Sequence, residues 1–177
     1  MKKVLILAVA VLSVFAVSCK NGSKSADASK ADAPKEEFKV PDDWQTYDVE
    51  NFSISFPAME VSSWSGVEFM NADGEGVDLD CTWGESSPTP AQLAEYGKNL
   101  KYLRTSMGET DVEDPVIDGN VLTLKSKDSN GKVILSFCVI RDDVDHGVAG
   151  SIVFDPAVNP DYEVTARNII STIKVKK

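Results

Sequence analysis

The stretch VLTLKSKDSNGKVILSFCVIR, Val121 to Arg141, decides the fold of this chain. The strand-like runs Val121 to Lys125 and Lys132 to Arg141 flank Asn130 and Gly131, and an Asn-Gly pair between strands is a strong signal for a β-hairpin. In the second run, from Lys132 to Arg141, apolar residues occupy both alternating faces. A strand with two apolar faces is usually covered on both sides. We therefore predict a central strand with packing partners above and below it.

Further strands are expected before and after this hairpin. Phe52 to Phe56 alternates apolar and polar residues and ends at Pro57, as a half-buried strand does. A second hairpin is predicted from Val67 to Trp83, with its turn at NADGEG (Asn71 to Gly76), and a last strand from Val148 to Phe154. These segments add up to an antiparallel sheet.

Two helices are expected to cover the sheet. Thr89 and Gln92 have the spacing of a capping box, and Pro90 suits the first helical position, so a helix is predicted from about Pro90 to Ser106. A final helix is expected to open at Asn159-Pro160. The apolar stripes that should face the core are Leu93, Tyr96, Leu100, Leu103 and Met107 in the first helix, and Tyr162, Ala166, Ile169 and Ile173 in the second.

The order of these elements predicts an α+β fold, an antiparallel sheet packed with two main helices. YDVENFSISFPA (Tyr47 to Ala58) and GVAGSIVFDPAVNPDYEVTARNIISTIKV (Gly147 to Val175) together resemble the PsbP-like fold, an α/β sandwich. Families with that fold include photosystem II extrinsic subunits, partners of a small GTPase and bacterial lipoproteins. The resemblance implies docking onto other molecules, and it carries over no set of functional residues.

The first residues have the pattern of a leader. Lys2 and Lys3 precede an apolar run, Val4 to Val17, which is shorter than the roughly 20 residues of a transmembrane helix. Ala16-Val17-Ser18-Cys19 resembles the lipobox of bacterial lipoproteins. That resemblance implies a signal peptide, residues 1–18, cleaved before a Cys19 that carries the lipid. An ordinary signal peptide and a retained transmembrane helix are the alternatives.

Residues 19–39 are expected to form a lipidated, flexible tether, and residues 40–177 a single α+β domain. The tether is made of small and polar residues with no apolar period, so it cannot bury enough surface to offset its ordering entropy. A coil of this length reaches roughly 25 Å. Lys20 stands where lipoproteins kept in the inner membrane often carry Asp, and we expect the periplasmic face of the outer membrane, in the cell envelope.

The composition argues against one class of partner. The 177 residues carry a net charge of -10, and without residues 1–18 there remain 16 basic and 28 acidic groups. Such a chain repels the phosphates of nucleic acids, so we expect no nucleic-acid partner.

No catalytic motif stands out. The single histidine, His146, is expected to be an exposed turn residue, without a nucleophile motif to serve. Asp142, Asp145 and His146 are conceivable metal ligands, yet clustered acids in turns are usually solvated, and we predict no metal and no cofactor. NADGEGVD lacks the spacing of a calcium loop. Paired carboxylates of glycosidase type remain open among Asp78, Asp80, Glu109, Asp111 and Glu113.

Cys81 and Cys138 remain once Cys19 is set aside. In an envelope compartment two such residues can form a disulfide, although both lie in apolar strands where a free cysteine also packs well. The sequence leaves both readings open.

These observations favour a lipid-anchored envelope protein that is not an enzyme and that binds an envelope protein or a ligand. The alternative is an envelope hydrolase that acts on glycans through paired carboxylates. A cleft lined by two acids and by aromatic residues such as Trp64 or Trp83 would favour it. A third reading is a purely structural component of the envelope.

Overall fold

The structure is a computed structural model that describes residues 38–58, 60–62, 67–70, 75–83 and 88–177. Within these residues, seven strands form one antiparallel sheet in the order β3-β4-β5-β9-β8-β7-β6, and three form a second sheet, β1-β2-β10. The elements are β1 (Gln45–Asp48), β2 (Phe52–Phe56), β3 (Glu60–Ser62), β4 (Val67–Met70), β5 (Gly76–Trp83), a 3-10 turn η2 (Pro90–Gln92), α1 (Leu93–Ser106), β6 (Val116–Asp118), β7 (Val121–Lys127), β8 (Val133–Ile140), β9 (His146–Phe154), α2 (Tyr162–Ser171) and β10 (Lys174–Val175).

Strand β8 confirms the prediction of a central strand covered on both faces. All eight of its residues are buried, and it pairs with β7 on one side and β9 on the other. Its alternate residues enter two different clusters. Leu135 and Phe137 belong to the main core, whereas Cys138 and Ile140 belong to a smaller cluster with Leu93 of α1.

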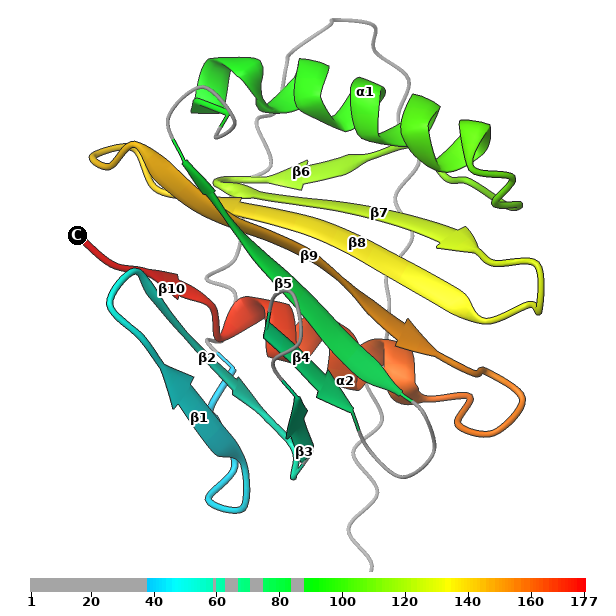
Figure 1. Cartoon of the computed structure of the whole chain (residues 1–177), viewed down its shortest axis with the longest axis horizontal. Coiled ribbons are helices and arrows are strands. Elements are labelled where there is room, and N and C mark those ends of the chain that lie inside the picture. Colours follow the sequence, from blue (N-terminus) through cyan, green and yellow to red (C-terminus); the bar gives the residue numbers. More distant parts are fainter. Residues whose placement is uncertain (1–37, 59, 63–66, 71–74, 84–87) are drawn as a thin grey trace, which may run out of the picture. The chain divides into compact units, whose positions relative to one another are not determined.

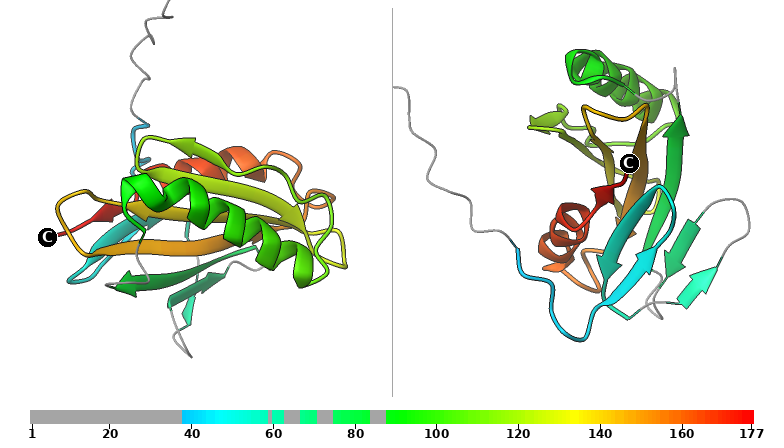
Figure 2. Two further views of the ribbon diagram at one scale, coloured as in Figure 1. Left: turned by 90° about the horizontal axis from the view of Figure 1, so that it is seen from above. Right: turned by 90° about the vertical axis from the view of Figure 1, so that its left-hand side faces the viewer.

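The two helices therefore lie on opposite faces of the seven-stranded sheet, as Figures 1 and 2 show. Helix α1 crosses the face made by β7, β8 and β9. Helix α2 and the small sheet cover the other face, where Phe52 and Ile54 of β2 join the main core. The α+β architecture with two main helices, inferred from the order of elements, is confirmed.

Helix α2 buries the stripe that the sequence predicts. Tyr162, Ala166 and Ile169 belong to the main core, and so does Ile173, which is predicted in the helix but lies two residues after its end at Ser171. Just after the helix, Thr172 Oγ1 accepts a hydrogen bond from the backbone N–H of Ser55 at 2.8 Å and lies 3.0 Å from the Ser55 carbonyl oxygen. This buried contact joins the end of α2 to β2, which explains how the C-terminal helix holds the small sheet in place.

Helix α1 buries only part of its predicted stripe. Leu93 is buried, and Tyr96 and Leu100 pack against the smaller cluster, but Leu103 and Met107 are 52% and 64% exposed. The prediction that the whole stripe is core is wrong for these last two residues. A periodic stripe shows which face of a helix is apolar, and it carries no information on where the sheet beneath that face ends.

The start of this helix agrees with the capping prediction. The backbone N–H of Thr89 donates to Gln92 Oε1 at 3.1 Å, and Pro90 opens a short 3-10 turn before the α-helical hydrogen bonds begin at Leu93.

The predicted hairpin at Asn130 and Gly131 is present between β7 and β8. Its turn is longer than an Asn-Gly pair alone indicates. The backbone N–H of Gly131 donates to the Asp128 carbonyl, and the N–H of Asp128 donates to the Lys132 carbonyl. Gly131 has a φ of 82°, a conformation that glycine adopts without strain. The side chain of Asp128 accepts two further backbone hydrogen bonds, from Asn130 and Lys132, and so closes the turn.

Four short strands, β1, β3, β6 and β10, are not among the predicted elements. Strand β10 has two residues and β6 has three, too few for an alternation to be read in a sequence. No helix within the described residues is long and apolar enough to cross a membrane.

The connection from α1 to β6 runs along β7 as an irregular edge strand, here called the acidic strap, Glu109–Pro115. Thr110 and Lys127 exchange two backbone hydrogen bonds, and Glu113 donates one to the Lys125 carbonyl. Between them, Asp111 has a φ of 49°, so the strap bulges there. Strand β7 is thus flanked by β6 along one part of its edge and by the strap along the rest.

Gly150 of β9 provides a test of the sheet packing. A Cβ atom at this position would lie 2.1 Å from the Asp78 carbonyl oxygen of the neighbouring strand β5 and 3.0 Å from the Phe137 ring. Gly150→Ala should therefore lower the free energy of unfolding by about 3 kcal/mol, near the upper end of the usual cost of overpacking. Urea denaturation of the purified protein measures this. Ser151→Ala, on the same strand at a half-buried position, is the control and should change stability little. Equal stabilities of Gly150→Ala and the unaltered protein would contradict the described register.

Candidate functional site

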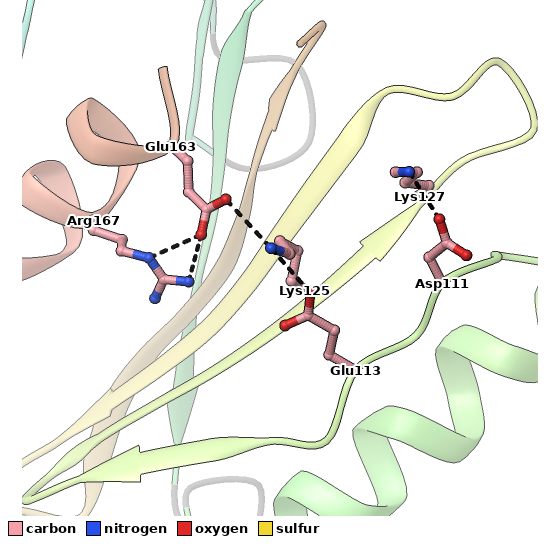
Figure 3. Close-up of polar contacts among 6 residues, drawn as sticks. All are labelled: Asp111, Glu113, Lys125, Lys127, Glu163 and Arg167. Carbon is pink, nitrogen blue, oxygen red and sulfur yellow. Dashed lines mark hydrogen bonds and ion pairs between the residues drawn. The ribbon is translucent and has the colours of Figure 1, made fainter. Parts of the chain in front are cut away.

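Three of the carboxylates that the sequence left open as catalytic acids lie in the acidic strap, and each is paired with a cation. Asp111 accepts from Lys127 Nζ at 2.8 Å, and Glu113 lies 2.9 Å from Lys125 Nζ. Figure 3 shows that these lysines project from β7 toward the strap. These ion pairs connect the strap to the sheet, so the role of both carboxylates is structural.

Glu109, the third of these acids, is nearly buried and pairs with Arg104 of α1 at 3.0 Å. It also accepts a hydrogen bond from Ser126 Oγ at 2.5 Å. The Arg104–Glu109–Ser126 contact joins the end of α1 to β7, so Glu109 too has its charge satisfied inside the fold.

The lysine pairs continue into a network that reaches α2. Lys125 Nζ lies 3.4 Å from Glu163 Oε2, and Glu163 in turn accepts hydrogen bonds from Arg167 at 2.6 and 3.0 Å (Figure 3). Lys125 therefore bridges a carboxylate of the strap and a carboxylate of α2. The network crosses from one edge of the sheet to the helix that covers its face.

The pKa values follow from these contacts. The hydrogen bond and charge of Lys127 lower the pKa of Asp111, and the hydrogen bond from Lys125 to Glu113 raises the pKa of Lys125. Burial alone would raise the pKa of Glu163, but the hydrogen bonds and charges of Arg167 and Lys125 outweigh it, so that pKa lies below its ordinary value. All three shifts favour the charged forms, which suits ion pairs and not a proton-transferring acid.

The remaining acids of this set are on β5. Asp78 is exposed and makes no ion pair within the described residues. Asp80 faces Ala149 of β9 in the register of the sheet. Trp64, suggested as an aromatic partner, lies outside the described residues, and Trp83 ends β5 opposite His146 in the same register.

The structure does contain a cleft, at the end of the domain where the label C lies in Figure 1. Its volume is about 950 Å³, within the range of ligand pockets. Four segments that are far apart in the sequence form it. They are the turn between β1 and β2, the residues that precede α1, the turn between β8 and β9, and the C-terminal Lys177.

His146 lies in the wall of this cleft and is only 5% exposed. The expectation of an exposed turn residue is wrong, because His146 is the first residue of β9 and packs inward. Its Nε2 lies 3.4 Å from the Asn51 carbonyl oxygen, and its Nδ1 lies 3.6 Å from Asp145 Oδ1. The structure thus brings together Asp142, Asp145 and His146 in one cleft, as their closeness in sequence allows.

The cleft has more acid than base. Its lining includes the carboxylates of Glu50, Asp142, Asp143 and Asp145 and the cations of Arg141 and Lys177. Both cations pair with Asp143, at 2.6 and 3.4 Å. Partial desolvation raises the pKa of Asp143, but the hydrogen bonds and charges of Arg141 and Lys177 outweigh it, so the pKa is lowered.

Among the described residues, three of these carboxylates have no lysine or arginine partner. Within the described residues, Glu50 and Asp142 make no ion pair, and Asp145 pairs with His146 alone. Asp142 accepts one hydrogen bond, from the side-chain amide of Asn120 at 2.8 Å.

No group of three or more histidine, cysteine, aspartate and glutamate side chains within the described residues is arranged to hold a metal ion. The segment NADGEGVD lies partly outside those residues, since residues 71–74 are not described.

The possible disulfide between Cys81 and Cys138 is not formed. Cys138 is a free, buried thiol, and burial raises its pKa to about 12. Strand β9 lies between the two cysteines, because Cys81 of β5 is paired with Val148 and Cys138 of β8 with Ala149. Backbones two strands apart are separated by roughly 9.5 Å, beyond the about 7 Å that a disulfide spans. Cys19 lies outside the described residues.

The chain matches no family model and no curated protein. Among solved structures it is similar to the solution structure of cyanobacterial PsbP (CyanoP) from Synechocystis sp. PCC 6803. The TM-score is 0.58, the sequence identity is 13%, and the match covers 77% of this chain and 95% of that chain. The chain has the PsbP-like fold. The resemblance noted in the sequence is thereby confirmed at the level of fold, and an identity this low shows nothing beyond it.

Sequence reasoning identified Asp142, Asp145 and His146 but missed that a cleft surrounds them. Glu50 and Lys177 reach the cleft from distant parts of the chain, and Arg141 directly precedes Asp142. The available signal was the acidic run DDVD directly after the most apolar strand, because polar residues at strand ends often lie on loops that carry binding sites.

The network around Glu163 predicts a specific pH dependence. Because the pKa of Glu163 is lowered in the folded protein, its ion pairs stabilise the fold above the ordinary value of 4.5, and this contribution is lost as the pH falls through the lowered pKa. Arg167→Gln should raise the pKa of Glu163, as measured by NMR titration of the carboxylate. The stability difference between variant and unaltered protein should shrink toward zero at low pH.

Lys98→Gln is the matched control, because Lys98 forms a pair with Glu95 in which both side chains are mostly exposed. It should leave the titration of Glu163 unchanged. An unchanged titration in Arg167→Gln would show that the network does not control this carboxylate.

Proposed function

We propose that this chain is a lipid-anchored bacterial cell-envelope protein without catalytic activity, whose domain binds an envelope protein or a ligand in the cleft beside His146. Residues 1–18 are the signal peptide, Cys19 carries the lipid, and residues 19–39 tether the domain to the membrane. The periplasmic face of the outer membrane is the proposed location. The observation that carries the binding role is the cleft of about 950 Å³, formed by four separate segments.

Two further observations support a binding module. The acids Glu109, Asp111 and Glu113 are each held in an ion pair, so they are not available as a catalytic pair. The PsbP-like fold is consistent with a non-catalytic binding role.

An envelope hydrolase that acts on glycans is the second candidate, and one observation favours it. The cleft holds several carboxylates, which glycoside hydrolysis requires. The aromatic residues expected beside them do not appear, since the described residues of the lining include no tryptophan, tyrosine or phenylalanine. Release of soluble fragments from peptidoglycan by the purified protein, abolished in a Glu50→Gln, Asp142→Asn double variant, would favour this candidate over the first.

The anchor is tested by changing its attachment atom. Cys19→Ser removes the thiol that would carry the diacylglycerol, so cells fed an alkyne-labelled fatty acid should no longer label the protein, and it should leave the outer-membrane fraction. Lys20→Gln keeps the thiol and should label like the unaltered protein. Equal labelling of Cys19→Ser would refute the assignment of the anchor.

The binding role is tested by photo-crosslinking in intact cells. A photoreactive amino acid at Glu50 or Asp145 should give adducts with the same partner, because both side chains line one cleft. Val164 of α2 is 65% exposed, does not line the cleft, and is the matched control position, which should give no such adduct. Adducts formed equally from all three positions, or from none of them, would count against docking at the cleft.

A further inference from the structure

We propose that the cleft binds a cationic peptide segment, one that presents a lysine or arginine side chain, and this inference rests on the proposed binding function. The cleft provides the space: about 950 Å³ is ample for a long side chain together with part of its backbone. The cleft is open to solvent, so an extended segment can enter it.

The charge distribution of the cleft walls favours a cationic ligand over an anionic one. Arg141 and Lys177 are already paired with Asp143, which removes them as partners for an anion. Glu50, Asp142 and Asp145 remain without a lysine or arginine partner among the described residues. A phosphate or carboxylate ligand would meet these three charges, whereas an ammonium or guanidinium group would be attracted to them.

The apolar part of the lining fits the same kind of ligand. Pro88, Pro90 and Val144 line the cleft beside the carboxylates, and Val144 also packs against the main core. Lysine and arginine carry an aliphatic stem that packs on apolar surface while the charged group stays near polar partners. A small inorganic cation or a free ammonium ion would leave these apolar contacts unused.

His146 lies between two walls of the cleft. It is almost completely buried, and it lies within reach of the Asn51 carbonyl on one side and of Asp145 on the other. The β1–β2 turn and the β8–β9 turn are therefore joined through one ring. A contact between two walls reduces the freedom that a pocket has to lose on binding, which favours affinity for its ligand.

The test uses the isotope-labelled full-length protein and a short peptide of alternating glycine and lysine as the probe. Addition of the peptide should shift the backbone amide signals of Glu50, Asp142 and Asp145, and the shifts should weaken as salt is added. The same peptide with acetylated lysines keeps the length and the stems but lacks the charge, and it should not shift these signals. Equal shifts by both peptides, or shifts only elsewhere on the domain, would overturn the inference.

Variants of the cleft complete the test. The double variant Asp142→Asn, Asp145→Asn should weaken binding of the lysine peptide by about three- to tenfold, the loss expected for two partly exposed charge pairs. Asp78→Asn removes an exposed carboxylate outside this cleft and should leave the affinity unchanged. Thermal unfolding checks that both variants are folded, and the single variant Glu50→Gln serves if the double variant is not.

The outcome also separates this inference from the proposed function. Crosslinks from Glu50 and Asp145 to one partner, together with no preference for the lysine peptide over its acetylated form, would overturn the cationic ligand and leave the binding role standing. Absence of crosslinks from the cleft would count against the binding role itself.

Discussion

The fold depends on one constraint, the burial of both faces of β8. Eight consecutive residues of this strand are shielded from water, so each face of the sheet needs its own cover. Helix α1 covers one face through Leu93 and the smaller cluster, and α2 with the small sheet covers the other. The positions of both helices serve this requirement, and the C-terminus returns beside β2 in the small sheet.

The same arrangement explains where the candidate site lies. Because the centre of the sheet is filled with apolar side chains, polar groups gather where its strands end. The cleft forms at one such end, and its walls come from turns that the core holds at a fixed spacing. The ion-pair network of Lys125 has a different purpose, since it joins the strap, the sheet and α2 with charges that are satisfied within the domain. The acids of the cleft and the acids of the Lys125 network thus look alike in the sequence. They differ in the groups with which their charges are paired.

Most of the fold could be predicted from the sequence, because the signals for β8, for the hairpin at Gly131 and for both helices are local. The wrong predictions concern the burial of single residues, because burial depends on how far the neighbouring elements of the fold extend. Leu103 and Met107 have the periodicity of core residues, but the surface beneath them ends too soon. His146 follows a polar turn, and only the inward packing of β9 shows that it is buried. The acidic run after β8 was a signal for one wall of the cleft, but its other walls could not be predicted, since Glu50 and Lys177 meet the β8–β9 turn only after folding. The separation of Cys81 from Cys138 likewise depends on strand order, which a sequence does not state.

The acidic strap has a consequence for the behaviour of the protein in a crowded solution. An open strand edge presents unpaired backbone groups that can add strands from other chains and so begin aggregation. Here β6 is only three residues long, and beyond it the edge of β7 is occupied by a charged segment with a bulge at Asp111. Bulges and charges at an edge prevent a further strand from aligning along it. The seven-stranded sheet therefore ends at this side, and a strand from a neighbouring copy is hindered from adding to this edge.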